Sequence, residues 1–182
     1  MEKATEIVGL RAVMAQRYAE ELATCAGALA RAFNAGGRLF TFGGSSTDAQ
    51  AVAQLFLDPG SGARALPALA LTADVAVLTA LANDVGFEVV FARPLAAFAR
   101  PGDVAVGLST SGGSTNVLRG FEEARRRGRV TVGFAGYVGS RMAAADTIEH
   151  LFVVPSPSVH RIQEVQTTTY HVLWELTQQA LG

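Results

Sequence analysis

Apolar residues recur at helical spacing along the first part of the chain, from Thr5 to Phe33, and this pattern stops at Gly36-Gly37. Spacings of three and four residues place side chains on one face of a helix, so the segment predicts one long helix or two shorter ones. Short apolar runs and helical patterns then alternate to the end of the chain. We expect strands at about 38–42, 66–71, 103–108, 130–134 and 149–154, and helices at about 48–57, 74–81, 88–98 and 158–180.

This alternation predicts an α/β fold behind a helical N-terminus. Parallel strands need long crossover connections, which the intervening helices supply, so we expect a five-stranded parallel sheet flanked by helices in the doubly wound, flavodoxin-like manner. The 182 residues contain no internal repeat, linker or low-complexity segment. One domain spanning residues 1–182 follows from this length and pattern.

A cluster of hydroxyl groups follows the third predicted strand. The run from Val104 to Ser114 joins a buried apolar stretch to two glycines and to the hydroxyls of Ser109, Thr110, Ser111 and Ser114. Backbone N–H groups at a helix start attract anions, and a loop after a parallel strand is where ligands bind. The segment contains no Lys or Arg, which favours a sugar phosphate held by neutral donors over a nucleotide. The structural alternative is that Ser114 only caps the next helix.

A second loop of glycine and serine, with Gly44 and Ser45 at its centre, follows the first predicted strand. Both loops would lie at the carboxyl edge of one sheet and face one crevice. Each loop alone is a weak signal, because a Gly-Gly turn after a strand is common. Together, at equivalent positions, they predict a sugar-phosphate site.

Composition narrows the class of protein without naming a ligand. The net charge of -1 and the pI near 6.3 provide no field for nucleic acid or anionic membrane, and no apolar run reaches the length of a membrane span. With no secretory pattern at the start, we expect a cytoplasmic protein. A lone Cys25 excludes an intramolecular disulfide. Apolar residues on the first and last helices, including Leu10, Met14, Tyr170 and Trp174, predict a homo-oligomer, either a dimer or a tetramer.

Four motifs along nearly the whole chain resemble the sugar isomerase (SIS) family, in its phosphoheptose isomerase branch. They are Gly44-Ser45 with Asp48-Ala49, the stretch 80–84 followed by Gly86-Phe87, the run 109–114, and Arg161-Ile-Gln-Glu164. The resemblance implies a homotetramer with shared active sites and a ligand such as sedoheptulose 7-phosphate. It implies that the phosphate is held by Ser45, Ser109, Thr110, Ser111 and Ser114. It also implies that Asp84 and Gln163 contact the sugar, and that His171 matches a histidine used as metal ligand and acid/base group.

The chain departs from this family at the positions of its metal chemistry. The family's zinc-binding histidine and proton-shuttling glutamate correspond to Ala51 and Leu55, and the aspartate before the last motif is replaced by His160. Gln163 and His171 alone fall short of the three protein ligands that a catalytic zinc commonly has. We therefore expect no tight metal site and no cofactor. The first loop is also two residues shorter than the family pattern.

Loss of the usual base leaves two functions open. Isomerisation through an enediol needs a base at carbon and an acid or electrophile at oxygen. The remaining candidates for these roles are Glu164, His171, His160, Asp84 and Asp48. Glu164 and His171 lie two helical turns apart and share a face, and we take them as the catalytic candidates, although a salt bridge for Glu164 and a packed interface role for His171 are the alternatives. The protein is either an isomerase with a relocated base or a catalytically silent sugar-phosphate-binding regulatory or adaptor module.

Overall fold

The computed structural model describes residues 2–44, 46–60 and 62–182. A single helix, α1 (Glu2–Asn34), precedes the sheet, which settles the choice between one helix and two. The other elements are β1 (Leu39–Gly43), α2 (Ser46–Leu57), β2 (Ala68–Ala70), α3 (Val75–Asp84), η1 (Phe87–Val89), α4 (Ala92–Phe98), β3 (Val104–Ser109), α5 (Thr115–Arg126), β4 (Val130–Gly136), α6 (Ser140–Ala143), β5 (His150–Val154) and α7 (Val159–Leu181).

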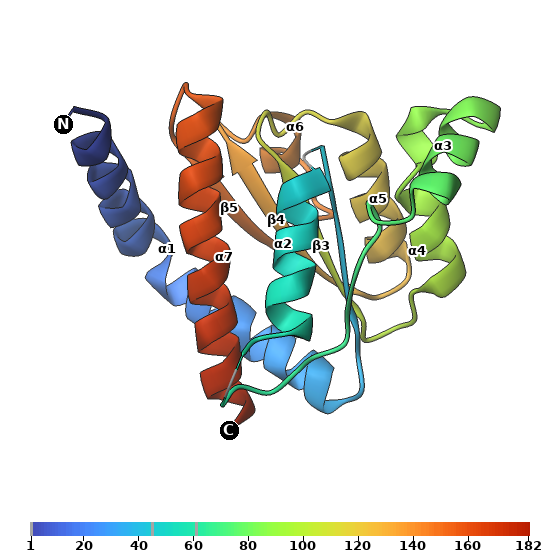
Figure 1. Ribbon diagram of the computed structural model, residues 1–182, viewed down its shortest axis with the longest axis horizontal. Coiled ribbons are helices and arrows are strands. Elements are labelled where there is room, and N and C mark those ends of the chain that lie inside the picture. Colours follow the sequence, from blue (N-terminus) through green and yellow to red (C-terminus); the bar gives the residue numbers. More distant parts are fainter. Residues whose placement is uncertain (1, 45, 61) are drawn as a thin grey trace.

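The five strands form one all-parallel sheet in the order β2-β1-β3-β4-β5, which confirms the predicted fold class. Helices α1, α2 and α7 cover one face, and α3, α4 and α5 cover the other (Figure 1). The chain turns from β1 to β2 on one side and continues from β3 on the other. The carboxyl ends of β1 and β3 therefore mark the point at which the strand order reverses, where open α/β sheets bind ligands.

Residues of β1 alternate between two hydrophobic cores. Leu39 packs among the side chains of α1, α2 and α7, while Phe40 and Phe42 pack against α4 and α5. All five residues of β1 and all six of β3 are buried. Such continuous burial is typical of parallel strands covered on both faces, and it explains the apolar runs in the sequence.

Three elements differ from the sequence-based expectation. β2 contains three residues instead of six, because it is an edge strand that pairs only with β1 and is preceded by Pro67, which has no N–H to donate. The helix expected over residues 88–98 is divided into η1 and α4. The short helix α6 was not expected from the sequence. Within the described ranges, no helix has the length and apolarity to cross a membrane.

Candidate functional site

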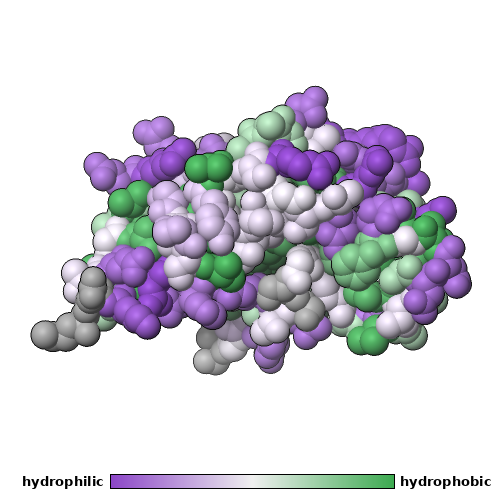
Figure 2. All heavy atoms as spheres, turned by 90° about the horizontal axis from the view of Figure 1, so that it is seen from above, coloured by the Kyte–Doolittle hydropathy of each residue, from purple (hydrophilic) through white to green (hydrophobic). Residues whose placement is uncertain are grey.

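The two glycine-containing loops meet at the carboxyl ends of β1 and β3. The Gly44 N–H donates to the Leu108 carbonyl oxygen at 3.1 Å. A Cβ added to Gly43 would lie 2.7 Å from that same oxygen, and one added to Gly44 would lie 3.6 Å from Ser114 Oγ. Larger residues would hold the strand ends apart, so the glycines allow the loops to form one concave edge. Figure 2 views the molecule from this side.

Three serine hydroxyls converge in the second loop, residues 109–114, which we call the cradle. Ser109 Oγ lies 2.9 Å from Ser114 Oγ and 3.4 Å from Ser111 Oγ, and the Gly113 N–H donates to Ser111 Oγ at 3.2 Å. Ser114 is the N-cap residue of α5, yet its side chain makes no capping hydrogen bond. The capping role considered for Ser114 is therefore not realised, and its hydroxyl instead joins the cluster.

The remaining predicted anion contacts have different surroundings. Thr110 is half-buried, and its carbonyl oxygen faces Gly136. Ser45 lies outside the described residues. Gly112 has a φ of +67°, and an added Cβ would lie 2.2 Å from the Gly139 carbonyl oxygen. The cradle thus rests directly on the loop after β4, a neighbour that the sequence did not reveal.

The helices α2 and α7 approach each other beside the cradle. Gln163 Nε2 donates to Asp48 Oδ2 at 3.2 Å, which links the last helix to the first turn of α2. Tyr170 lies about two helical turns after Gln163 and donates a long hydrogen bond to Thr167 Oγ1 at 3.4 Å. Burial raises the pKa of the Tyr170 hydroxyl, and the nearby Asp48 carboxylate raises it further. Of the candidate carboxylates, Asp48 is the one that the structure brings against a predicted sugar-contacting residue.

The two catalytic candidates of the last helix lie on its outer side. The Glu164 carboxylate forms an ion pair with the Arg161 guanidinium, which also binds Glu6 of α1 at 3.3 Å. His171 is exposed, and its ring stacks on Tyr170 with 5.2 Å between ring centroids.

Two further candidates are exposed on α3 and α7. Asp84 is exposed at the end of α3, and His160 is exposed in the first turn of α7. No hydrogen bond within the described ranges connects either residue to the cradle.

The residues at the family's metal positions do not fit a zinc ion. Ala51 and Leu55 lie on α2 against the apolar core and offer no donor atom. Gln163 is engaged with Asp48, and His171 is exposed on the next helix face. In the described part of the chain, no group of three or more His, Cys, Asp or Glu side chains is arranged to hold a metal.

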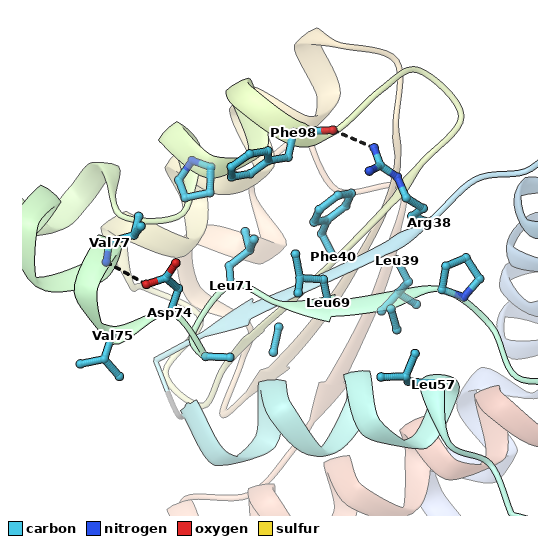
Figure 3. Close-up of a pocket in the computed structure, with 15 residues that line it drawn as sticks. Arg38, Leu39, Phe40, Leu57, Leu69, Leu71, Asp74, Val75, Val77 and Phe98 are labelled. Atoms are coloured by element: carbon cyan, nitrogen blue, oxygen red, sulfur yellow. Dashed lines mark hydrogen bonds between the residues drawn. The ribbon is translucent and has the colours of Figure 1, made fainter.

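A cavity of about 850 Å³ lies away from the cradle along the edge strand β2 (Figure 3). Its lining is mainly apolar and includes exposed Leu57, Leu69, Val75 and Phe98. Arg38 closes one end by donating from Nη2 to the Phe98 carbonyl oxygen at 2.7 Å. Apolar side chains also gather at the right of Figure 2, where α3 and α4 lie. This groove contains no convergent set of hydroxyls and is not a phosphate site.

Comparison with known proteins places this arrangement in a defined class. The family model described as "SIS domain" matches residues 4–136. The phosphoheptose isomerase of Aquifex aeolicus (strain VF5) is 41% identical over 177 residues, covering 96% of this chain and 92% of that protein. The phosphoheptose isomerase of Desulfovibrio desulfuricans is 46% identical over 171 residues, covering 92% and 77%.

Solved structures agree with the sequence relatives. A phosphoheptose isomerase from Neisseria gonorrhoeae superposes with a TM-score of 0.88 at 30% identity, covering 98% of this chain and 96% of that one. A phosphoheptose isomerase from Francisella tularensis gives a TM-score of 0.90 at 27% identity, covering 98% and 95%. The fold is thus that of a SIS domain protein. Within that class, the chain belongs to the phosphoheptose isomerase family.

Proposed function

We propose that this protein is a phosphoheptose isomerase-like enzyme that converts a ketose phosphate of the sedoheptulose 7-phosphate type to the aldose phosphate. The observation that carries this proposal is the convergence of the Ser109, Ser111 and Ser114 hydroxyls at the point where the strand order reverses. Neutral hydroxyls and a helix N-terminus suit a phosphate group. The relatives named above support an isomerase over an adaptor module.

The proposed ligand lies with its phosphate in the cradle, and its sugar extends toward α7. Gly44, Ser45, Ser109, Thr110, Ser111 and Ser114 hold the phosphate, and Gln163 and Asp84 contact the sugar. The link between Gln163 and Asp48 supports the sugar direction, because it fixes the amide beside the start of α2. Asp84 is exposed at the end of α3, and its contact with the sugar is part of this proposal.

For the reaction itself, a group must remove a proton from C1 of the ketose while O2 gains a proton, and the resulting enediol must be protonated at C2 while O1 loses its proton. Leu55 supplies no such group, so we assign this proton transfer to the last helix, with His171 and Glu164 as its carriers. Of the two, the geometry supports His171, because the Glu164 carboxylate is held by Arg161. The proposed step uses no metal.

We also propose that the protein assembles as a dimer or tetramer through apolar surface left exposed on α1, α7 and beside α3. Leu10 and Trp174 of the predicted interface are half-buried, and Val8 of α1 is exposed. Met14 and Tyr170 are buried between α1, α7 and the sheet. By contrast, α3 has no buried residue, and Leu69 is 51% exposed in the groove beside it. Exposed apolar surface of this kind marks subunit interfaces. A sugar-phosphate substrate is consistent with the cytoplasmic location that the sequence predicts.

The proposed activity is tested by incubating the purified protein with sedoheptulose 7-phosphate in deuterated water, with and without added zinc. Nuclear magnetic resonance should show an aldose phosphate and deuterium incorporation at the reacting carbons. The double variant Ser111→Ala with Ser114→Ala should bind at least about 5-fold more weakly, since each lost hydroxyl contributes about 0.5 to 1.5 kcal/mol. Binding by the wild type without any exchange identifies the silent module instead.

A further inference from the structure

The cradle contains no cation of its own, although a phosphate monoester carries a charge of about -1.5 to -2 at neutral pH. Its serine hydroxyls are neutral, and the N-terminus of α5 contributes roughly half a positive charge. Within the described ranges, one basic side chain reaches the residue that follows the cradle. Arg141 of α6 donates from Nη1 to Thr115 Oγ1 at 3.2 Å.

The loop that carries Arg141 is fixed against the cradle by its backbone. The Met142 N–H donates to the Gly112 carbonyl oxygen at 2.9 Å, and the Gly139 carbonyl leaves no room for a Cβ on Gly112. Ser140 Oγ lies 3.6 Å from the position of a Cβ on Gly113. Met142, which follows Arg141, therefore contacts the cradle directly, and Ser140, which precedes it, lies nearby.

This loop holds an uncommon backbone conformation. Tyr137 and Ser140 have φ values of +54° and +46°, and Gly139 has a φ of +80°. Left-handed backbone costs a residue with a Cβ about 1 to 2 kcal/mol, and it persists where the surroundings enforce it. Here the left-handed residue Ser140 immediately precedes Arg141 and starts α6 beside the cradle. The strained backbone at Ser140 therefore positions the Arg141 side chain beside the cradle.

The charge of Arg141 is unfavourable where it stands unless an anion is nearby. A helix N-terminus repels cations, and Thr115 is the first residue of α5. Glu88 lines a small cavity together with Thr115, so one carboxylate faces the same region. No ion pair within 4 Å joins Arg141 to Glu88 in the described residues. The guanidinium is exposed and has donors left for a ligand.

We propose that Arg141 is a specificity-determining residue that supplies the cationic contact to the phosphate from outside the neutral cradle. This inference rests on the proposed function, because it assumes that the cradle is the phosphate site. Arg141 then distinguishes a phosphorylated sugar from the neutral sugar, while the serines orient the phosphate oxygens.

The test is calorimetric titration of sedoheptulose 7-phosphate, inorganic phosphate and unphosphorylated sedoheptulose into the full-length protein. Arg141→Ala and Arg141→Gln should bind both phosphates about 10-fold more weakly at low salt, as expected for a lost hydrogen bond to a charged group. Arg141→Lys should stay within about 3-fold of the wild type, since it keeps the charge. Affinity for the unphosphorylated sugar should not change. The wild type should lose affinity with added salt more steeply than Arg141→Ala.

The matched control is Arg126→Ala, which removes one exposed arginine from the other end of α5, roughly 16 Å away by helix geometry. It should bind the phosphates like the wild type. If Arg141→Ala also binds like the wild type while the Ser111 and Ser114 double variant is weakened, the role of Arg141 is refuted and the proposed function stands. If the wild type binds inorganic phosphate but no sugar phosphate, the proposed function fails and the Arg141 comparison is still decided with inorganic phosphate. Equal weakening of all three Arg141 variants, with a lowered Tm, would show a structural role and refute the proposal.

Discussion

Adding one methyl group at Gly112 tests whether the contact with the loop after β4 holds the cradle in place. A Cβ there would lie 2.2 Å from the Gly139 carbonyl oxygen and 2.6 Å from the carbonyl carbon, and φ is +67°. In Gly112→Ala, the cradle must therefore move away from the loop after β4. That movement stretches the hydrogen bond from the Met142 N–H to the Gly112 carbonyl oxygen, which is 2.9 Å long. We expect both stability and phosphate binding to fall.

The cost of the steric overlap can be separated from the cost of the left-handed backbone by a matched control at Gly128. This residue has a φ of +69° but nothing within 4 Å of an added Cβ. Both alanine variants meet the left-handed penalty of about 1 to 2 kcal/mol, offset by about 0.4 to 1 kcal/mol from the restricted unfolded chain. Gly112→Ala adds an overlap that costs about 1 to 3 kcal/mol. For a domain of this size, Tm falls by about 2 to 4 °C for each kcal/mol.

Thermal unfolding followed by circular dichroism should therefore give a clearly lower Tm for Gly112→Ala than for Gly128→Ala. Titration with sedoheptulose 7-phosphate should show affinity reduced by about 10-fold or more in Gly112→Ala, because displaced serines lose hydrogen bonds to a charged group. Gly128→Ala should bind like the wild type. Equal Tm values together with unchanged phosphate affinity in Gly112→Ala would refute the steric coupling between the two loops.

Other predictions concern the reacting groups, the metal positions, the core and the assembly. His171→Ala should lower kcat by about 100-fold while phosphate affinity is kept, which steady-state kinetics and titration can separate; unchanged kcat would remove His171 from the mechanism. Ala51→His combined with Leu55→Glu places two ligands one helical turn apart beside Gln163 and should create zinc binding that metal analysis can measure. Stoichiometric zinc in the unmodified protein would contradict the expectation of no tight metal site. Gln166 is 1% exposed, and neither polar atom of its side-chain amide has a hydrogen-bond partner among the described residues. Gln166→Met should therefore raise Tm by about 2 °C or more in thermal unfolding. A lower Tm would show that the amide is hydrogen-bonded in solution. Sedimentation at micromolar concentration should show a dimer or tetramer, and a stable 19.0 kDa monomer would contradict the proposed assembly.

The sequence predicted the sheet well because buried parallel strands produce apolar runs. It overestimated β2, whose three paired residues lie at the sheet edge and depend on a single neighbour. It did not reveal that Met14 and Tyr170 pack within the chain itself, since an apolar helix face is the same in sequence whether it meets another helix or another subunit. Pairing of α1 with α7 is a long-range contact that no local pattern encodes.

The candidate site was predicted in part. The motif in the cradle located the hydroxyl cluster, because its residues are contiguous in the chain. The contact between Asp48 and Gln163 joins segments 115 residues apart, and nothing in either segment singles out that pair. The approach of Arg141 to Thr115 likewise depends on the left-handed turn before α6.

The groups proposed to bind the ligand and those proposed to react with it rest on different parts of the fold. The cradle is built on strand ends, where backbone hydrogen bonds from the Gly44 N–H to the Leu108 carbonyl and from the Met142 N–H to the Gly112 carbonyl hold it in place. Positions 51, 55, 163 and 171 lie on the sides of α2 and α7, where a side chain can change without altering a strand. With this division, substitutions on the two helices can change the reacting groups without disturbing the phosphate-binding loops. New activities on phosphorylated compounds can then arise through a few helix substitutions.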